Sequence, residues 1–148
     1  MRFLGTIEAK IDTKGRAFLP AAFRKVLQAS GEESLVLRKD EYQPCLVLYP
    51  MSVWNQKTDE LRVRLNLWDP KHRQMFRQFT AFAMELTLDG NGRFLLPKNI
   101  MKQVDIDQDI RFIGFDDKIE IWSASEEPFM SPEDFGNALA EVMGNPLL

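Results

Sequence analysis

The chain spells nearly the same ten residues twice. Residues 11–20 read IDTKGRAFLP and residues 88–97 read LDGNGRFLLP, an offset of 77 residues. A weaker echo relates CLVLYP at 45–50 to KIEIWS at 118–123. Two copies in 148 residues are too few for a solenoid, so they predict two half-domains packed about a pseudo-twofold axis. The identical pairs in the motif include Asp12 and Asp89, Gly15 and Gly92, and Arg16 and Arg93.

Each copy has the composition of a tight turn between two strands. Asp-x-x-Gly suits a type I turn, and a left-handed glycine after that turn makes a bulged hairpin loop. The Asp carboxylate can accept hydrogen bonds from N–H groups of the turn. The flanking residues alternate, so Asp12–Gly15 and Asp89–Gly92 are predicted to be hairpin tips. Pro20 and Pro97 mark the starts of short helices, so each half reads strand, turn, strand, helix, strand, strand.

A helical hairpin is predicted between the copies. Ser52 can cap a first helix that carries Trp54, Leu61 and Leu65. Asp69 and Pro70 form the start of a second helix. We expect Phe76 and Phe79 to face inward and Trp54 and Trp68 to lie near an interface. The apolar stripe of the second helix comprises Met75, Phe76, Phe79 and Phe82.

The segment after the second copy predicts one more helix. Phe135, Leu139 and Val142 would share its apolar face. The predicted fold class is α+β, with the two repeated halves packed about a pseudo-twofold axis. The predicted division is 1–53 for the first repeat, 54–82 for the helical connector, 83–126 for the second repeat and 127–148 for the C-terminal helix and tail.

Charge is unevenly distributed along the chain. The net charge is −3, but residues 1–80 carry 14 Lys and Arg against 9 Asp and Glu, whereas residues 81–148 carry 5 against 13. Such asymmetry is a weak indication that the basic half binds a polyanion.

No pattern for catalysis or metal binding is found. His72 is the only histidine and reads as a solvated helix residue. Asp105, Asp107 and Asp109 resemble the opening of a calcium loop, but its required glycine is replaced by Ile110. Cys45 lies in an apolar run and reads as a buried small side chain. We therefore expect that the chain is not an enzyme and that it binds no metal, cofactor or small-molecule substrate.

Arg16 and Arg93 each follow a turn glycine by one residue. The structural interpretation is an ion pair with Asp12 or Asp89 that braces the turn. The functional interpretation is a rigidly presented guanidinium fork that contacts guanine or phosphate. The two interpretations are compatible, because the carboxylate can orient the guanidinium.

These residues together resemble the MraZ family of bacterial transcription regulators, which carry two AbrB-like (SpoVT/AbrB) halves per chain. The resemblance covers about residues 1–126 and both copies keep the Asp-x-x-x-Arg motif. It also rests on Gly5, PCLVLYP at 44–50, Gly114 in FIG, and KIEIW at 118–122.

The resemblance implies a swapped-hairpin β-barrel and ring-shaped homo-oligomers. It also implies sequence-specific binding to repeated boxes in double-stranded DNA. Those boxes lie upstream of the family's own operon, which encodes cell-wall synthesis and division proteins. The second copy is less basic, so Arg93 is expected to be secondary. The residues expected to contact DNA are Arg16, Lys14 and Arg2, with Arg24 and Lys25 nearby.

One alternative function remains open. AbrB-like barrels also occur in antitoxins, in which case the acidic C-terminal part would bind a partner protein. The N-terminus lacks a signal-peptide pattern, and no apolar run reaches the roughly 20 residues of a membrane span. We therefore expect a cytoplasmic, nucleoid-associated protein with no membrane partner.

Overall fold

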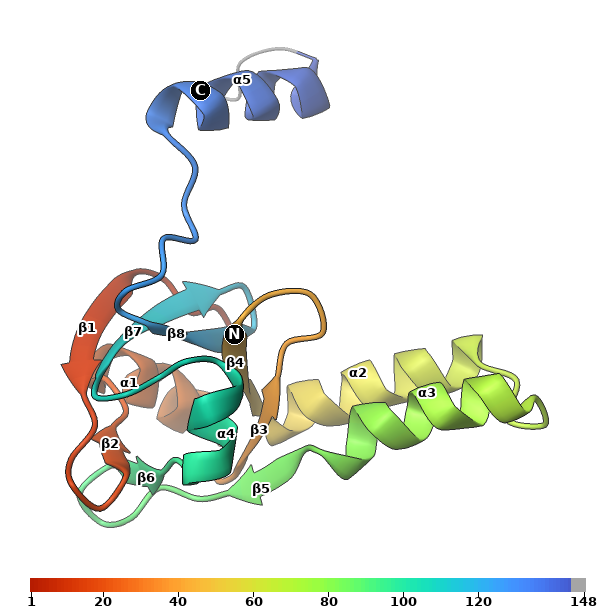
Figure 1. Ribbon diagram of the computed structural model, residues 1–148, viewed down its shortest axis with the longest axis horizontal. Helices are drawn as coiled ribbons and strands as arrows, with labels where there is room; N and C mark the ends of the chain where they lie inside the picture. Colours follow the sequence, from red (N-terminus) through yellow and green to blue (C-terminus); the bar gives the residue numbers. More distant parts are fainter. Residues whose placement is uncertain (145–148) are drawn as a thin grey trace.

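A computed structural model describes residues 1–144 and has a mixed α+β architecture. Six strands form one antiparallel sheet in the order β1-β7-β8-β4-β3-β5, and β2 and β6 form a separate antiparallel ribbon (Figure 1). The strands are β1 (Thr6–Lys10), β2 (Arg16–Phe18), β3 (Leu35–Lys39), β4 (Cys45–Pro50), β5 (Met84–Leu86), β6 (Arg93–Leu95), β7 (Asp109–Phe115) and β8 (Lys118–Ser123).

The strand order is the same when the two halves are exchanged. Exchange replaces β1 by β5, β3 by β7 and β4 by β8, and it leaves the six-strand order unchanged. Equivalent residues also face one another: Ala17 is paired with Phe94 in the ribbon, and Val47 with Glu120 in the sheet. The pairing therefore has the pseudo-twofold symmetry that the repeat predicts.

The strands that flank each predicted turn do not pair with each other, as a simple hairpin would require. The turn after β1 leads into β2, but β1 pairs with β7 and β2 pairs with β6, so each half supplies strands to the other. The physical reason is burial: the ribbon turns Ala17 and Phe94 inward, where both are almost fully buried. A hairpin confined to one half would not bring these two side chains together at the centre of the core.

The core lies between the sheet, the ribbon and two short helices, α1 (Ala21–Ala29) and α4 (Lys98–Gln103). Phe23 and Leu27 of α1 are buried and Val26 packs against the same cluster, as predicted from helical spacing. The ring of Phe23 meets that of Phe3 edge-on, with centroids 5.7 Å apart. Gly31 follows α1 at φ +68°, so it ends the helix as expected.

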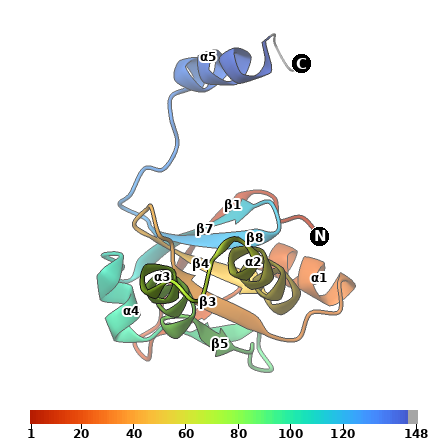
Figure 2. The same cartoon turned by 90° about the vertical axis from the view of Figure 1, so that its right-hand side faces the viewer.

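The helical hairpin consists of α2 (Met51–Arg64) and α3 (Pro70–Ala81) and projects from one side of the sheet (Figure 1). Figure 2 looks along this hairpin, so that both helices are seen nearly end-on. Asp69 caps α3 by accepting a hydrogen bond from the Lys71 N–H at 2.9 Å, as predicted. Ser52 is not the cap of α2, because Pro50 occupies that position; the Ser52 hydroxyl instead contacts the Glu32 carboxylate.

Stacked side chains attach the base of the hairpin to the sheet. The Trp54 ring lies parallel to the Phe79 ring at 5.0 Å and beside Tyr49 at 5.6 Å. The Arg38 guanidinium lies 4.3 Å from the Phe79 centroid. Trp54 is thus packed against its own chain while remaining half-buried, and its expected place near an interface stays a prediction. Trp68, by contrast, is 94% exposed in the loop between the helices.

The last described element is α5 (Pro132–Met143), which an extended segment holds away from the rest of the molecule (Figure 1). The Ser131 hydroxyl caps it by accepting from the Asp134 N–H at 3.1 Å, and Gly144 ends it at φ +77°. The predicted helix is therefore present, but its apolar face is not covered by the described residues. Residues 145–148 of the predicted tail lie outside the described residues.

A membrane-spanning helix is not found within residues 1–144, where no helix combines sufficient length with sufficient hydropathy.

Candidate nucleic-acid interface

The first turn is a type I turn followed by a glycine bulge. The Gly15 N–H donates to the Asp12 carbonyl at 3.0 Å, and the Asp12 N–H donates to the Arg16 carbonyl at 2.9 Å. Gly15 has φ +83°, in the left-handed region that glycine tolerates. Asp12 Oδ1 accepts from the backbone N–H groups of Lys14 and Arg16 at 2.9 and 2.8 Å. The predicted local chemistry of the turn is confirmed.

The second turn repeats the first bond by bond. The Gly92 N–H donates to the Asp89 carbonyl at 3.0 Å, and Gly92 has φ +80°. Asp89 Oδ1 accepts from the N–H groups of Asn91 and Arg93, both at 2.9 Å. The exchange of Lys14 for Asn91 therefore changes the charge of the turn without changing its backbone.

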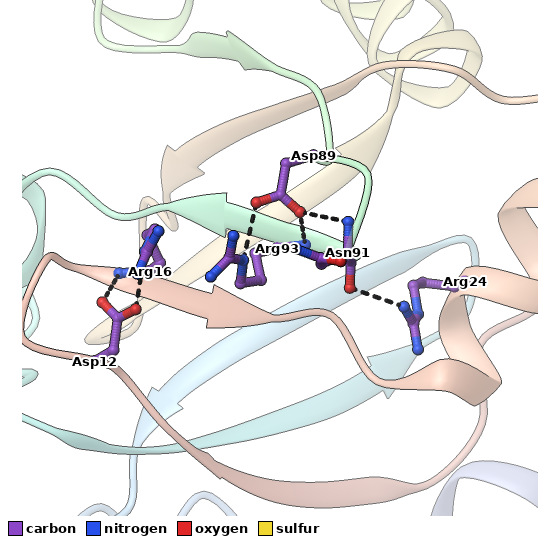
Figure 3. Close-up of polar contacts among 6 residues, drawn as sticks. All are labelled: Asp12, Arg16, Arg24, Asp89, Asn91 and Arg93. Carbon is purple, nitrogen blue, oxygen red and sulfur yellow. Dashed lines mark hydrogen bonds and ion pairs between the residues drawn. The ribbon is translucent and has the colours of Figure 1, made fainter.

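Each turn carboxylate also orients the arginine of its own turn. Arg16 Nε donates to Asp12 Oδ2 at 2.8 Å, and Arg93 Nε donates to Asp89 Oδ2 at 2.9 Å (Figure 3). Within residues 1–144, neither arginine has a protein hydrogen bond to Nη1 or Nη2. The carboxylates thus hold the inner edge of each guanidinium and leave its outer fork available, as the combined interpretation requires.

The same contacts keep both carboxylates ionised. The hydrogen bond from the Arg16 N–H is the largest cause that lowers the pKa of Asp12 below its ordinary value of 3.8. The Arg93 N–H lowers the pKa of Asp89 in the same way. At neutral pH the carboxylate of each turn is therefore paired with the guanidinium of the same turn, and Lys14 adds an exposed positive charge to the first turn only.

The two arginines share the outer face of the ribbon. Arg16 is opposite Leu95 and Arg93 is opposite Phe18 in the strand register. Phe18 and Leu95 are 56% and 54% exposed, and the Arg93 guanidinium lies 5.8 Å from the Phe18 ring centroid. The outer face therefore combines two oriented cations with two exposed apolar side chains, and the pseudo-twofold relates one pair to the other.

Backbone hydrogen bonds tie each turn to the opposite half. The Leu19 N–H donates to the Gly92 carbonyl at 2.9 Å, and the equivalent Leu96 N–H donates to the Gly15 carbonyl at 2.8 Å. Both leucines are buried. Because each turn is fixed from two sides, the arginines are presented from a rigid support.

Arg24 lies at the second turn, not beside Arg16 as expected. Its Nη1 donates to the Asn91 carbonyl at 3.3 Å (Figure 3). A Cβ added to Gly92 would lie 2.1 Å from the same Nη1, which shows how closely the side chain covers this turn. The strand exchange explains the difference, because it places α1 of the first half over the turn of the second.

Two lysines of the second half lie at the first turn, and sequence reasoning missed them. Lys98 and Lys102 of α4 line a cavity of about 450 Å³ together with Asp12 and Gly15. The signal that identifies these lysines is the pairing of β2 with β6, which brings α4 beside the first turn.

The structure places the other predicted residues separately. Lys14 is exposed at the tip of the first turn. Lys25 is exposed on α1, and no ion pair is described for it within residues 1–144. Arg2 lies at the far end of β1, where its Nη1 donates to Asp116 at 2.6 Å. The strand β1 separates Arg2 from the turns, so these residues do not form one cluster.

The remaining candidate residues have structural environments. Burial raises the pKa of the Cys45 thiol to about 12, so it is not a reactive thiolate. His72 Nδ1 accepts from the Asn66 N–H at 2.9 Å and thereby braces the loop between α2 and α3. In the part of the chain that the structure describes, no three metal-binding side chains gather.

The comparison with protein families matches residues 2–78 and 79–126 to the family described as "MraZ protein, putative antitoxin-like". The chain belongs to the MraZ family. The two matched segments correspond to the two copies of the repeat, so the MraZ match accounts for both arginine turns.

Curated relatives resemble the chain over nearly its whole length. A protein of Phocaeicola vulgatus named transcriptional regulator MraZ is 60% identical, covering 97% of this chain and 95% of its own. A protein of Bacteroides thetaiotaomicron with the same name is 56% identical, with 98% and 94% covered. One of Bacteroides fragilis is 54% identical, with 97% and 92% covered.

Proposed function

We propose that the chain is a transcriptional regulator that binds double-stranded DNA sequence-specifically through the outer face of the β2–β6 ribbon. The observation that carries this proposal is the pair of carboxylate-oriented arginines, Arg16 and Arg93, whose outer guanidinium forks have no protein partner among the described residues. The relatives' name, transcriptional regulator MraZ, supports the same function.

The geometry suits a DNA groove. The major groove is about 12 Å wide and accepts a two-stranded ribbon. An arginine whose Nε is held by a carboxylate presents its two Nη groups in a fixed plane, which favours bidentate contact with guanine or phosphate. The pseudo-twofold of the ribbon matches the local twofold of duplex DNA, so the two arginines can meet equivalent groups on the two strands.

We propose that both turns contribute to binding, in contrast to the expectation that Arg93 is secondary. The second turn lacks the equivalent of Lys14, but Arg24 lies over it. The first turn has Lys14 and is flanked by Lys98 and Lys102. Each turn therefore combines an arginine of its own half with a cation from the helix of the other half. Arg2 and Lys25 remain predicted peripheral contacts.

We further propose that the two sheets belong to one swapped-hairpin barrel and that several copies form a ring. A single turn with a few phosphate contacts would bind weakly and lose affinity steeply with salt. A ring on tandem boxes links several such contacts, which raises apparent affinity by roughly 10²–10⁴. The boxes would lie upstream of the chain's own cell-wall and division operon, in the cytoplasm at the nucleoid.

Arginine substitutions test this proposal. Arg16→Ala should cost about 1–3 kcal/mol of binding free energy for each engaged turn, and Arg93→Ala should cost a similar amount. Both side chains lie on the ribbon surface, so the fold and the assembly should be unchanged. The measurement is an electrophoretic mobility shift with the chain's own upstream DNA, accompanied by circular dichroism.

Arg62→Ala is the matched control for these variants. Arg62 is exposed in the last turn of α2, away from the ribbon, so its loss should leave the shift almost unchanged. A normal shift with the Arg16→Ala, Arg93→Ala double variant would contradict the assignment of the interface.

A second function class is favoured by one observation. The acidic α5 is held apart from the body and exposes Phe135 and Val142, as a partner-binding arm would. The family description also contains the words "antitoxin-like". Limited proteolysis separates the two: rapid cleavage in residues 124–131 of the assembled protein would favour an arm that waits for another protein, and resistance would favour a helix already docked.

A further inference from the structure

We infer that α5 of one copy docks on the outer face of α3 in a neighbouring copy. This inference rests on the homo-oligomer of the proposed function and names the contact that would hold it. It begins from α5, which has a complete set of helix-end signals although it is detached from its own body. These signals are the Ser131 cap, Pro132 in the first turn, two acidic residues beside it and the left-handed Gly144.

A helix of this kind needs a surface to pack against. Isolated helices shorter than about 12–15 residues are marginal in water, and α5 spans only Pro132–Met143. Its apolar residues Phe135 and Val142 are 56% and 83% exposed, and Leu139 lies between them on the same face. The capped ends and the uncovered apolar face together indicate a helix that is stable when it is docked.

The helical hairpin offers a matching surface on α3. Met75 and Phe82, the residue that caps the C-terminus of α3, are seven residues apart, so they share one face of the helix. Phe82 is 72% exposed and Met75 is 47% exposed. Phe79 points instead towards α2, where it stacks on Trp54, so the exposed stripe is not needed to hold the hairpin together.

Charge selects α3 as the surface for α5. Residues 119–148 contain no Lys or Arg, and the segment 124–144 contains five Asp and Glu. Helix α3 contains Lys71, Arg73 and Arg77 and no acidic residue. Opposite charge favours encounter and correct partner choice.

The same charges disfavour the other surfaces. The outer face of α2 has the exposed Val63, but Asp59 and Glu60 lie beside it with Arg64, so its charge is mixed, whereas α3 has no acidic residue. Two copies of α5 would bring like charges together. The ribbon face also combines cations with exposed apolar side chains, but it is the surface proposed to bind DNA. Of the helical surfaces, the stripe on α3 is therefore the one whose charge and apolar side chains both suit α5.

The directions of the two elements favour docking between copies. Helix α5 and the hairpin leave the sheet in different directions (Figures 1 and 2). A contact between α5 of one copy and α3 of the next uses two different surfaces, so it is heterologous and repeats around a ring when the rotation closes.

Cross-linking between two differently tagged copies tests the contact. One copy carries Met75→Cys and the other Leu139→Cys, and they are expressed together and oxidised mildly without DNA. We expect a disulfide that joins the two tags. The native Cys45 does not interfere, because it is buried and its thiol pKa is raised to about 12. The matched control replaces Leu139→Cys by Asn137→Cys, on the opposite face of α5, and should give little product.

Two results would overturn the contact. One is a yield no higher than that of the Asn137→Cys control. The other is a double variant, Met75→Cys with Leu139→Cys, that forms its disulfide only within one chain, which would show that α5 folds back on its own hairpin.

Native mass spectrometry separates this inference from the ring itself. We expect Leu139→Glu to lose the assembly and Asn137→Glu to retain it, with unchanged thermal unfolding of the body because α5 stands apart from it. An assembly that survives Leu139→Glu would leave the ring intact and overturn this contact. A monomeric native chain would overturn both, whereas the DNA contact of Arg16 is measured independently.

Discussion

Two glycines of the second turn should respond differently to the same substitution. Gly92 has φ +80°, and an added Cβ would lie 2.1 Å from Arg24 Nη1. Gly90 has no atom within 4 Å of an added Cβ and no positive φ. We predict that Gly92→Ala lowers the free energy of unfolding by about 1–2 kcal/mol, the cost of a left-handed non-glycine residue. Gly90→Ala should change it by less than about 0.5 kcal/mol.

Urea unfolding of the two variants measures this difference. Gly92→Ala must also displace Arg24, so its DNA binding should weaken more than that of Gly90→Ala. Equal effects of the two substitutions on stability and binding would contradict the described conformation of the turn.

The turn carboxylates predict a dependence of stability on acid pH. The pKa values of Asp12 and Asp89 are lowered in the folded chain below their ordinary value of 3.8. Their stabilisation is therefore complete above the unfolded value and is lost as the pH falls through the lowered folded values. The double variant Asp12→Asn, Asp89→Asn should lack this part of the acid transition.

Unfolding titrations between about pH 6 and pH 2 compare the native chain with the Asn variant. The free energies of unfolding of the two proteins should converge towards acid pH. Protonation of Asp12 and Asp89 removes from the native chain the stabilisation by ionised carboxylates that the Asn variant already lacks. A constant separation between the two curves over this range would contradict the role of the carboxylates.

The difference between local and distant contacts explains which site residues the sequence could predict. Asp12, Gly15 and Arg16 interact within five consecutive residues, so their geometry follows from turn chemistry. Arg24 and Asn91 are 67 residues apart, and their contact exists only because the strands are exchanged. Residue spacing alone could not place Arg24 at the second turn.

At the scale of elements, the ribbon has two faces that should behave differently. Phe94 points inward, where it is almost fully buried and meets the Phe112 ring edge-on at 6.2 Å. Phe18 points outward beneath Arg93. We predict that Phe94→Ala lowers stability by about 3–5 kcal/mol through the cavity it leaves. Phe18→Ala should leave stability nearly unchanged but weaken DNA binding.

Thermal unfolding and anisotropy on the same preparations distinguish these two losses. Finding that Phe18→Ala destabilises the chain as strongly as Phe94→Ala would show that the outer face is not a free surface. Normal binding by a stable Phe18→Ala variant would exclude its ring from the interface.

Most elements could be predicted because their signals are local. Alternation identifies β4 and β8, and Asp69 with Pro70 identifies the start of α3. The partners of β1 and β2 could not be predicted from residue patterns, because many pairings satisfy a short alternating strand. The packing of Trp54 could not be predicted from the sequence either, because an apolar residue on a helix face is compatible with both a core and an interface. The division at residues 53, 82 and 126 remains a prediction.

At the scale of the whole molecule, the strand exchange places the arginine turns of both repeats on one symmetric surface. Arg24 of the first half lies at the second turn, and Lys98 and Lys102 of the second half lie at the first turn, although the whole chain has a net charge of −3. The acidic residues of α5 stand apart from the ribbon (Figure 1), so they need not face the duplex. Net charge alone is therefore a poor guide to the partner of this chain.

The most direct test of the central claim is fluorescence anisotropy of the native protein across a salt series. One labelled duplex carries the chain's own upstream sequence and the other carries the same bases shuffled. We predict that the native duplex binds at least roughly 10³-fold more tightly, the lower range for specific recognition, and that both affinities fall steeply as salt rises. Equal affinities would contradict sequence-specific reading by the ribbon, and absence of binding to either duplex at low salt would contradict DNA binding altogether.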